Sequence, residues 1–362
     1  MRIHLIYPHG PSVSCPNAIG RHLAAGLSAD HGHTVFLYDW DQVGTIRPRP
    51  GDVLLGHPHP NPLTIFRRSL RSSGWRRTIA LSPFNTDPLQ MGFADTVISR
   101  VDAYLAITGN YWHSKMQSSL LAHWAPKLVH VDLAVDRSDF PQVKAQFAPV
   151  GERRFVYIGH SGWQKNPEYL EAISAALPGT SFSWIGGGSR KLRGYEPIGR
   201  LDFANEQARE VVRQYDFLLT VGKYDANPAT ILEAMSWGLI PICTPESGYS
   251  GYPSIINVPL DDVAETVRVL TRLQKLPPND LLELQARNYG MLSGRFSWER
   301  FVGQVANAIE DDSPTPPIRE DLSRRLLLRA YSMRSPYNAW RPDNLAKLLR
   351  RQVRQLLQHS PS

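Results

Sequence analysis

The stretch YDANPATILEAMSWGLIP, at residues 224–241, decides the fold class of the chain. It has one carboxylate at Asp225 in a loop and a second at Glu233 within a short, apolar, helix-like run. A strand-like segment, LIPIC, follows that run immediately. An acid in a helix too short and apolar to be exposed on all faces is either a structural partner or a ligand-binding group. Asn227 is placed to cap the start of this helix.

Apolar runs alternate with helical patterns on both sides of this stretch, as they do in parallel α/β proteins. Each run is short and bounded by Gly, Pro or polar residues, which predicts a buried strand. Those of the first half are RIHLIYP (2–8), HTVFLYD (33–39), DVLLGHP (52–58), RTIALSP (77–83), AYLAITG (103–109) and KLVHVDL (127–133). Those of the second half are RFVYIGH (154–160), FSWIGGG (182–188), FLLTVGK (217–223), IPICTP (240–245) and SIINVPL (254–260).

The segment PQVKAQFAPVGE, at residues 141–152, has no strong period and marks a boundary between the two halves. We therefore expect an α/β protein with two Rossmann-like doubly wound domains facing a central cleft, followed by a basic helical C-terminal extension. The expected bounds are 1–145, 146–312 and 313–362. In such sheets a ligand binds at the carboxyl ends of the strands.

The composition of the 362 residues is that of an ordinary globular protein. The first ten residues have too short an apolar run for a signal peptide, and no apolar run in the sequence is long enough to span a membrane. Cys15 and Cys243, the two cysteines, offer neither a metal spacing nor a disulfide framework. We expect a cytoplasmic protein.

The positive charge is concentrated at the C-terminus. The chain has 40 Lys+Arg and 33 Asp+Glu, and residues 318–362 contain ten of the basic and three of the acidic side chains. The first 317 residues are therefore neutral overall, which argues against a nucleic-acid partner.

Two basic and apolar segments favour a surface role. Residues 343–357, DNLAKLLRRQVRQLL, have the pattern of an amphipathic helix, and TIFRRSLRSSGWRR, at 64–77, adds five arginines in the first half. Such a helix binds an anionic membrane surface, or it packs on its own protein or on a second subunit of a homo-oligomer. We expect residues 318–357 to contact the inner face of a membrane, with packing as the alternative.

Two glycine-containing strand exits lie in the second half. In RFVYIGHSGWQKN, Gly159, Ser161 and Gly162 form a turn free of bulk, and Lys165 follows. Such a turn presents N–H groups to an anion, and a lysine adds a charge. It is either a diphosphate site or an ordinary loop with a surface lysine. The second exit, WIGGGS, contains Gly187 and does not match the dinucleotide-binding spacing.

These features together resemble the GT-B glycosyltransferases, specifically the retaining family 4, over most of residues 1–312. That family's signature is an acid, seven residues and a glutamate followed by Ala-Met and a glycine; here it reads Asp225, ANPATIL, then Glu233-Ala-Met-Ser-Trp-Gly238. The two glycine exits, VDLAVDRSDF near Asp136 and the helical stretch FSWERFVGQVANAI, which in this fold crosses back to the first domain, resemble further family segments.

The resemblance implies a retaining transfer of a sugar from a UDP- or GDP-sugar, without a metal or other cofactor. The first domain would bind the acceptor and the second the donor. Lys165 would neutralise the donor diphosphate, Glu233 would hold the ribose and Asp225 would contact the sugar. The implied donor-binding residues are Gly159, His160, Ser161, Gly162, Gly187, Asn227, Thr230, Ser247 and Gly248. On the acceptor side the candidates are His57 and His59, with solvated loop imidazoles as the alternative.

Two departures from the family pattern motivate a second hypothesis. Asp225 stands where glutamate is usual, and His160 stands where the phosphate-binding arginine is usual. The alternative is a catalytically silent, nucleotide-sugar-binding or scaffolding subunit. For an active enzyme the expected acceptor is a saccharide, including a lipid-linked one.

Overall fold

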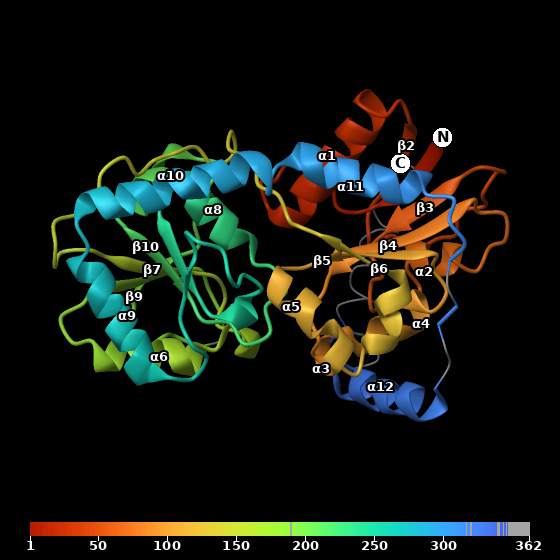
Figure 1. The fold of residues 1–362 in the computed structure, drawn as a ribbon. Helices are drawn as coiled ribbons and strands as arrows, with labels where there is room; N and C mark the ends of the chain where they lie inside the picture. Colours follow the sequence, from red (N-terminus) through yellow and green to blue (C-terminus); the bar gives the residue numbers. More distant parts are fainter. Residues whose placement is uncertain are drawn as a thin grey trace, which may run out of the picture.

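The computed structural model describes residues 1–188, 190–315, 317–318, 321–338, 341–342, 344 and 346. The chain forms two α/β halves, each built on a parallel six-stranded sheet (Figure 1). This arrangement confirms the predicted fold class. The expected amphipathic helix at 343–357 lies largely outside the described residues.

The first sheet has the strand order β2-β1-β3-β4-β5-β6. Its strands are β1 (Arg2–Ile6), β2 (Thr34–Tyr38), β3 (Val53–Gly56), β4 (Arg77–Pro83), β5 (Ala103–Ile107) and β6 (Leu128–Val131). The helices of this half are α1 (Cys15–Ala29), α2 (Ile65–Ser69), α3 (Pro88–Met91), α4 (Asp95–Ile98) and α5 (Asn110–Lys115). Three 3-10 turns accompany them: η1 (Gly92–Ala94), η2 (Met116–Ser118) and η3 (Ala122–Lys127).

The second sheet has the strand order β12-β11-β10-β7-β8-β9. Its strands are β7 (Phe155–Ile158), β8 (Phe182–Ile185), β9 (Glu196–Gly199), β10 (Phe217–Thr220), β11 (Ile240–Cys243) and β12 (Ile256–Asn257). Its helices are α6 (Pro167–Ala176), α7 (Glu206–Arg213), α8 (Ala229–Trp237), α9 (Val263–Lys275) and α10 (Pro278–Gly294), with the 3-10 turns η4 (Trp163–Lys165) and η5 (Pro245–Ser247).

The strand order sets where each half can bind a ligand. All strands are parallel, but the order in which the chain adds them reverses between β1 and β3 and again between β10 and β7. Helices connected to the two sides lie on opposite faces, which leaves a crevice at the carboxyl ends of these strands. Each half therefore has one such switch point. The loops after β3, β7 and β10 contain His57 and His59, Lys165 and Asp225 respectively.

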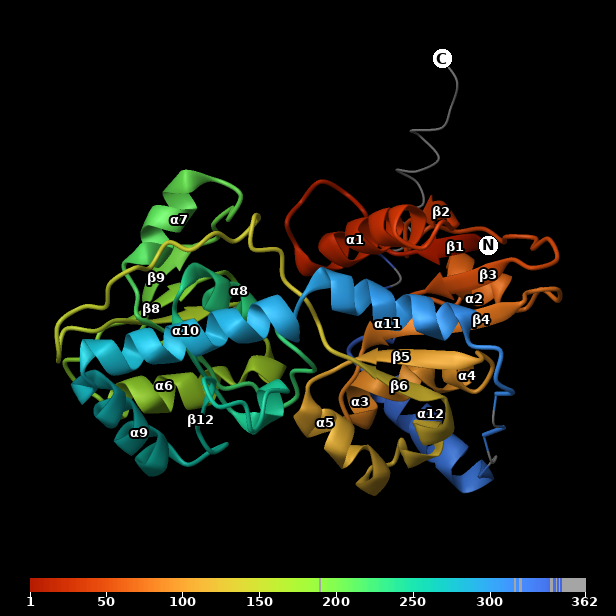
Figure 2. The same ribbon diagram turned by 45° about the horizontal axis from the view of Figure 1, so that its top comes forward.

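The chain crosses between the halves twice, and the two crossings lie side by side. The first follows β6, and the second joins α10 to α11 (Trp298–Glu310), which packs on α1 of the first half (Figure 2). The N–H of Val135 donates to the carbonyl of Phe296 at 3.2 Å. Arg295 Nε lies 3.0 Å from Asp132 Oδ2, so an ion pair also joins the two crossings.

The last described helix, α12 (Leu322–Arg334), returns to the first half and packs against α3 and η1 (Figure 1). Leu328 is its buried anchor, at 1% exposure. A Cβ on Gly92 would lie 3.0 Å from the carbonyl of Leu328, so a glycine there permits the close approach. The helix α12 is thus part of the first half.

Candidate functional site

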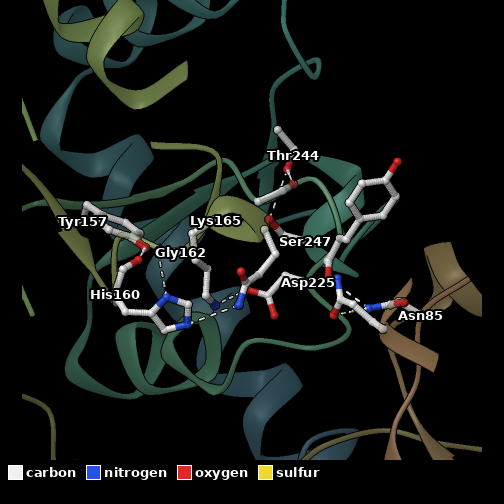
Figure 3. A network of polar contacts seen from close by, with 12 residues as sticks. Asn85, Tyr157, His160, Gly162, Lys165, Asp225, Thr244 and Ser247 are labelled. Carbon is white, nitrogen blue, oxygen red and sulfur yellow. Dashed lines mark hydrogen bonds and ion pairs between the residues drawn. The ribbon is translucent and has the colours of Figure 1, made fainter. Parts of the chain in front are cut away.

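The expected donor residues gather at the switch point of the second sheet. Lys165, at the end of η4 after β7, forms an ion pair with Asp225, in the loop after β10 (Figure 3). Both side chains are about 15% exposed, at 16% and 15% respectively. A charge pair in such a partly dehydrated position interacts more strongly than one in water. The two residues are 60 apart in sequence, and the topology brings them together.

The glycine-containing loops after β7 (Gly159–Gly162) and β8 (Gly186–Gly188) pack closely against each other. We call this surface the glycine floor. A Cβ on Gly186 would lie 1.9 Å from the carbonyl oxygen of Gly159, so no side chain fits there. A Cβ on Gly188 would lie 1.9 Å from Ser161 Oγ. Ser161 Oγ is itself buried and has no hydrogen-bond partner among the described residues. The floor therefore combines glycine backbone with an unpaired hydroxyl, a combination suited to a polar ligand.

Gly162 and Gly187 complete this floor. The N–H of Gly162 donates to His160 Nδ1 at 2.9 Å, which leaves the proton of a neutral imidazole on Nε2. Burial, and then the charge of Lys165, lowers the pKa of His160, so the ring is neutral at pH 7. A Cβ on Gly187 would lie 2.9 Å from Arg200 Nε. The sequence did not single out this guanidinium, which lies against the second glycine exit.

Glu233 is almost fully buried in α8, at 9% exposure. Burial raises the pKa of its carboxyl to about 7, and the charge of Lys165 partly opposes that shift. The helix is short because it ends at Gly238, whose φ of 95° is in the left-handed region that favours glycine. Thr230 lies half-buried in its first turn.

The prediction that Asn227 caps α8 is wrong. The N-cap residue is Pro228, and no side chain caps the helix. Asn227 instead has its amide nitrogen and oxygen buried, with no partner among the described residues. Buried polar groups are normally hydrogen-bonded, so this amide is available to a ligand.

Ser247 and Gly248 shape the loop after β11. The hydroxyl of Ser247 lies 3.1 Å from that of Thr244, and both groups are buried. The N–H groups of Ser247 and Gly248 donate to Thr244 and Pro245 within the turn, at 3.0 and 2.9 Å. These two amides are therefore engaged in their own loop.

Side chains of the first half contact this site directly. The indole of Trp112 in α5 donates to the carbonyl oxygen of Asp225 at 2.7 Å. The amide of Asn85, after β4, donates to the carbonyl oxygen of Tyr224 at 3.0 Å (Figure 3). The hydroxyl of Tyr111 donates to Glu246 Oε1 at 2.7 Å. Sequence reasoning missed these residues, and their only signal is their place after a predicted strand.

Cys15 is the first residue of α1 in the first half. Burial, and then the charge of Glu233, raises the pKa of its thiol to about 12. The hydrogen bonds from Asn85, Tyr111 and Trp112 of the first half to the loops of the second bring the two halves together here. The site therefore receives groups from both halves.

His57 and His59 lie after β3, at the switch point of the first sheet. The His57 ring contacts Trp40 with 4.8 Å between centroids, and its pKa falls to about 3 through burial and then through the charges of His59 and Arg67. His59 Nδ1 accepts the N–H of Asn61 at 3.1 Å. His57 is thus a neutral, partly buried ring at pH 7.

Two features of the described residues bear on the expected partners. They contain no group of three or more His, Cys, Asp or Glu side chains arranged to hold a metal ion. None of the helices in that part of the chain is long and apolar enough to cross a membrane.

Comparison with solved structures places this fold among GT-B glycosyltransferases. The sucrose-phosphate synthase of Thermosynechococcus elongatus superposes with a TM-score of 0.65 at 15% identity, over 85% of this chain and 98% of the other. A glycosyltransferase from Rickettsia africae ESF-5 gives 0.62 at 10% identity, over 86% and 98%. An alpha-glucosyltransferase in complex with UDP and DNA gives 0.58 at 13% identity, over 86% and 99%. Neither a protein-family model nor a curated protein sequence matches the chain.

Proposed function

We propose that the chain is a retaining glycosyltransferase that moves a sugar from a nucleotide-diphosphate sugar to a hydroxyl of a saccharide acceptor, without a metal ion. The observation that supports this most is the ion pair between Lys165 and Asp225 at the β7–β10 switch point. The charge of Lys165 also acts on the buried carboxyl of Glu233 and lowers its pKa. The signature that resembles family 4 contributes the two acids. Neighbours of the same fold that were solved with UDP or UDP-glucose favour a nucleotide sugar as the donor.

The donor would lie across the glycine floor. Lys165 would neutralise the diphosphate, and Ser161 and the backbone at Gly159, Gly162 and Gly187 would line it closely. The buried carboxylate of Glu233 would accept both ribose hydroxyls, and the unpaired amide of Asn227 would bond to another polar group of the donor. Hydrogen bonds from these hydroxyls would compensate the buried carboxylate for its lost contact with water. They would therefore lower the pKa of Glu233 and favour its ionised form.

The donor diphosphate would also replace Asp225 as the partner of Lys165. The carboxylate of Asp225 would then be free to accept a hydrogen bond from a hydroxyl of the transferred sugar. In this scheme the ion pair keeps both side chains in place before the donor arrives, and the reaction site is assembled with little rearrangement.

The transfer would proceed through an oxocarbenium-like state. The bond between the anomeric carbon and the diphosphate oxygen breaks while the acceptor oxygen bonds to the same face of that carbon. The acceptor's proton passes to the leaving phosphate oxygen. Lys165 stabilises the charge that develops on the diphosphate, and such fixed positive groups are a large contribution to catalysis.

The acceptor would enter from the first half, beside His57 and His59. A neutral His57 offers one N–H donor and one acceptor nitrogen, and Trp40 beside it offers an apolar face for a sugar ring. These groups orient an acceptor and do not need to remove its proton.

Thermal unfolding with UDP, GDP and their common sugar conjugates tests the proposal, with Glu233→Ala alongside. Ligand at one hundred times its Kd adds about 2.7 kcal/mol to the free energy of unfolding. We expect one nucleotide to stabilise the protein and Glu233→Ala to abolish the effect. No stabilisation by any of these ligands would refute the donor site.

The alternative, a silent nucleotide-sugar-binding subunit, is favoured by Asp225 and His160 at positions where the family has other residues. Donor turnover separates it from an enzyme. The purified protein with the stabilising nucleotide sugar should release the free nucleoside diphosphate slowly without acceptor, and Lys165→Met should abolish that release. Binding without any turnover, with and without a panel of saccharide acceptors, would instead establish the silent subunit.

A further inference from the structure

We propose that a small cavity between α2 and α4 of the first half binds a phosphate group. The cavity has a volume of about 210 Å³. Sites for whole drug-sized ligands have volumes of roughly 300–1,000 Å³, so this cavity suits a small anion or the charged end of a larger molecule. Its walls come from α2, from α4 and from the few residues that flank these two helices.

The lining of this cavity is strongly positive. Among the described residues it contains three guanidiniums and no carboxylate. The guanidiniums are those of Arg67 in α2, Arg71 just after that helix and Arg100 just after α4. Within the described part of the chain, none of the three has an ion-pair partner. Their charge is therefore available to an anion.

The one acid of α4, Asp95, does not line this cavity. Trp124 Nε1 donates to its Oδ1 at 2.9 Å, and His123 Nε2 lies 2.7 Å from the same oxygen. The charge of Arg325 also acts on this carboxyl. Asp95 is thus engaged by groups outside the cavity, and it leaves the three guanidiniums without a counter-charge.

Arg67 is the member of the cluster that an anion would stabilise most. It is partly buried, and its Nη2 donates to the carbonyl oxygen of Phe93 at 2.6 Å, which fixes the guanidinium at the cavity wall. Its Nε is buried and has no hydrogen-bond partner among the described residues. Burial, and then the like charges of Arg100 and Arg71, lowers its pKa to about 10. An anion in the cavity would offset both of these destabilising effects.

The number of cationic groups favours phosphate over a carboxylate. The planar guanidinium binds either anion through paired N–H groups. A carboxylate has only two oxygens, whereas a phosphate group has at least three acceptor oxygens and carries up to about two negative charges. The hydroxyl of Thr96 lines the same cavity and can donate to a further oxygen. The rest of the lining is apolar, and such surroundings strengthen the attraction between charges.

This assignment divides the basic segment 64–77 into two parts. Arg76 and Arg77 form ion pairs with Asp312 and Asp311, at 2.6 and 2.8 Å, and so hold the chain after α11 against the first half. The arginines of the segment that line the cavity have no such partner. No residue of the lining belongs to the loops after β7 and β10, so the phosphate site does not rest on the proposed function.

Titration calorimetry of the full chain with inorganic phosphate, at constant ionic strength, tests the proposal, with acetate as the comparison anion. We expect phosphate to bind at least tenfold more tightly than acetate. Arg71→Gln/Arg100→Gln should weaken phosphate binding at least tenfold, and both positions are exposed, so the variant should fold. The matched variant Arg272→Gln/Arg300→Gln removes the same charge from exposed positions of α9 and α11, and it should change the affinity less than twofold.

Lys165→Met separates this site from the donor site, because the donor site is itself expected to bind phosphate groups. Phosphate affinity in Lys165→Met should change less than twofold. Stabilisation by the nucleotide should be unchanged in Arg71→Gln/Arg100→Gln. Loss of nucleotide stabilisation in the wild type, with phosphate still bound, would refute the donor site alone.

Vesicle flotation identifies the source of the phosphate group. Phosphatidylcholine vesicles that contain phosphatidate should bind Arg71→Gln/Arg100→Gln at least tenfold more weakly than the matched variant if the cavity receives a lipid headgroup. Equal vesicle binding by the two variants, together with the loss of inorganic phosphate binding, assigns the cavity to a soluble phosphate compound.

Three calorimetric outcomes would overturn the proposal. They are the absence of phosphate binding, acetate binding as tight as that of phosphate, and equal weakening by the two double variants. The first would leave the cavity without this ligand, the second would show that the cluster attracts any anion, and the third would indicate general charge attraction.

Discussion

The indole nitrogen of Trp112 and the carbonyl oxygen of Asp225 are 2.7 Å apart and join the two halves of the molecule at the candidate site. The backbone of Asp225, in the second half, is therefore held by a residue of the first half. The position of Asp225 depends on how the halves meet, as well as on its own loop.

Replacing Trp112 with Phe removes this hydrogen bond and keeps an aromatic ring. We expect the free energy of unfolding to fall by about 1 kcal/mol. Transferase kcat/KM should fall roughly tenfold, because small displacements of positioned groups are costly. Trp75→Phe is the control, since it loses an equivalent 2.9 Å bond to Ser69 within the first half. Equal losses of activity in both variants would contradict a role in positioning Asp225.

Lys165→Met should weaken nucleoside diphosphate binding by roughly 10- to 100-fold, because charge-assisted hydrogen bonds contribute about 1.5–3 kcal/mol. Titration calorimetry with the stabilising nucleotide measures the change. Lys275→Met, in the last turn of α9, removes the same charge far from the β7–β10 switch point and serves as the control. An unchanged Kd in Lys165→Met would show that this lysine serves only the ion pair.

Glu233 should make stability depend on pH. Its pKa is raised by burial from 4.5 to about 7, so between these values the folded protein binds more protons than the unfolded chain. The free energy of unfolding therefore decreases as pH rises through this window, by about 3 kcal/mol at most. Glu233→Gln should remove that decrease in urea unfolding between pH 4.5 and 8. Glu283→Gln, an exposed acid of α10, should not. Parallel pH profiles for wild type and Glu233→Gln would contradict the shift.

Gly186→Ala should destabilise the second half and abolish donor binding. The added methyl would lie 1.9 Å from the backbone at Gly159, and the φ of 151° is itself unfavourable for alanine. Overpacking of this kind costs about 1–3 kcal/mol or more. Gly290→Ala in α10 meets nothing within 4 Å and should be neutral or slightly stabilising. Thermal unfolding of the two variants provides the comparison, and similar behaviour would contradict the packed floor.

The sequence predicted most of the fold because its buried strands are continuous apolar runs. All eleven expected segments contain a strand, but β2 is largely exposed where a buried strand was expected. It missed β9, whose residues EPIG are largely exposed and lack that signal. It also misplaced the N-cap of α8, since a proline took the position expected for Asn227.

For the site, the motif pointed to Lys165 and Asp225, and the structure brings these two together. It did not point to Trp112, Asn85 or Tyr111, whose contacts span more than 110 residues of sequence. Such contacts depend on how two separately folded halves meet, which local patterns of hydrophobicity and charge do not encode.

The paired crossings at Val135 and Phe296 have a mechanical consequence. Because both covalent connections pass through one place and are bonded to each other there, we expect them to act as a hinge with a single axis. Opening of the molecule is then a swing about that axis, with little sliding of one half along the other. The Trp112–Asp225 hydrogen bond lies away from this axis and joins the two halves in the closed arrangement. We expect such an opening to break this hydrogen bond, and closure to restore the same alignment of Asp225.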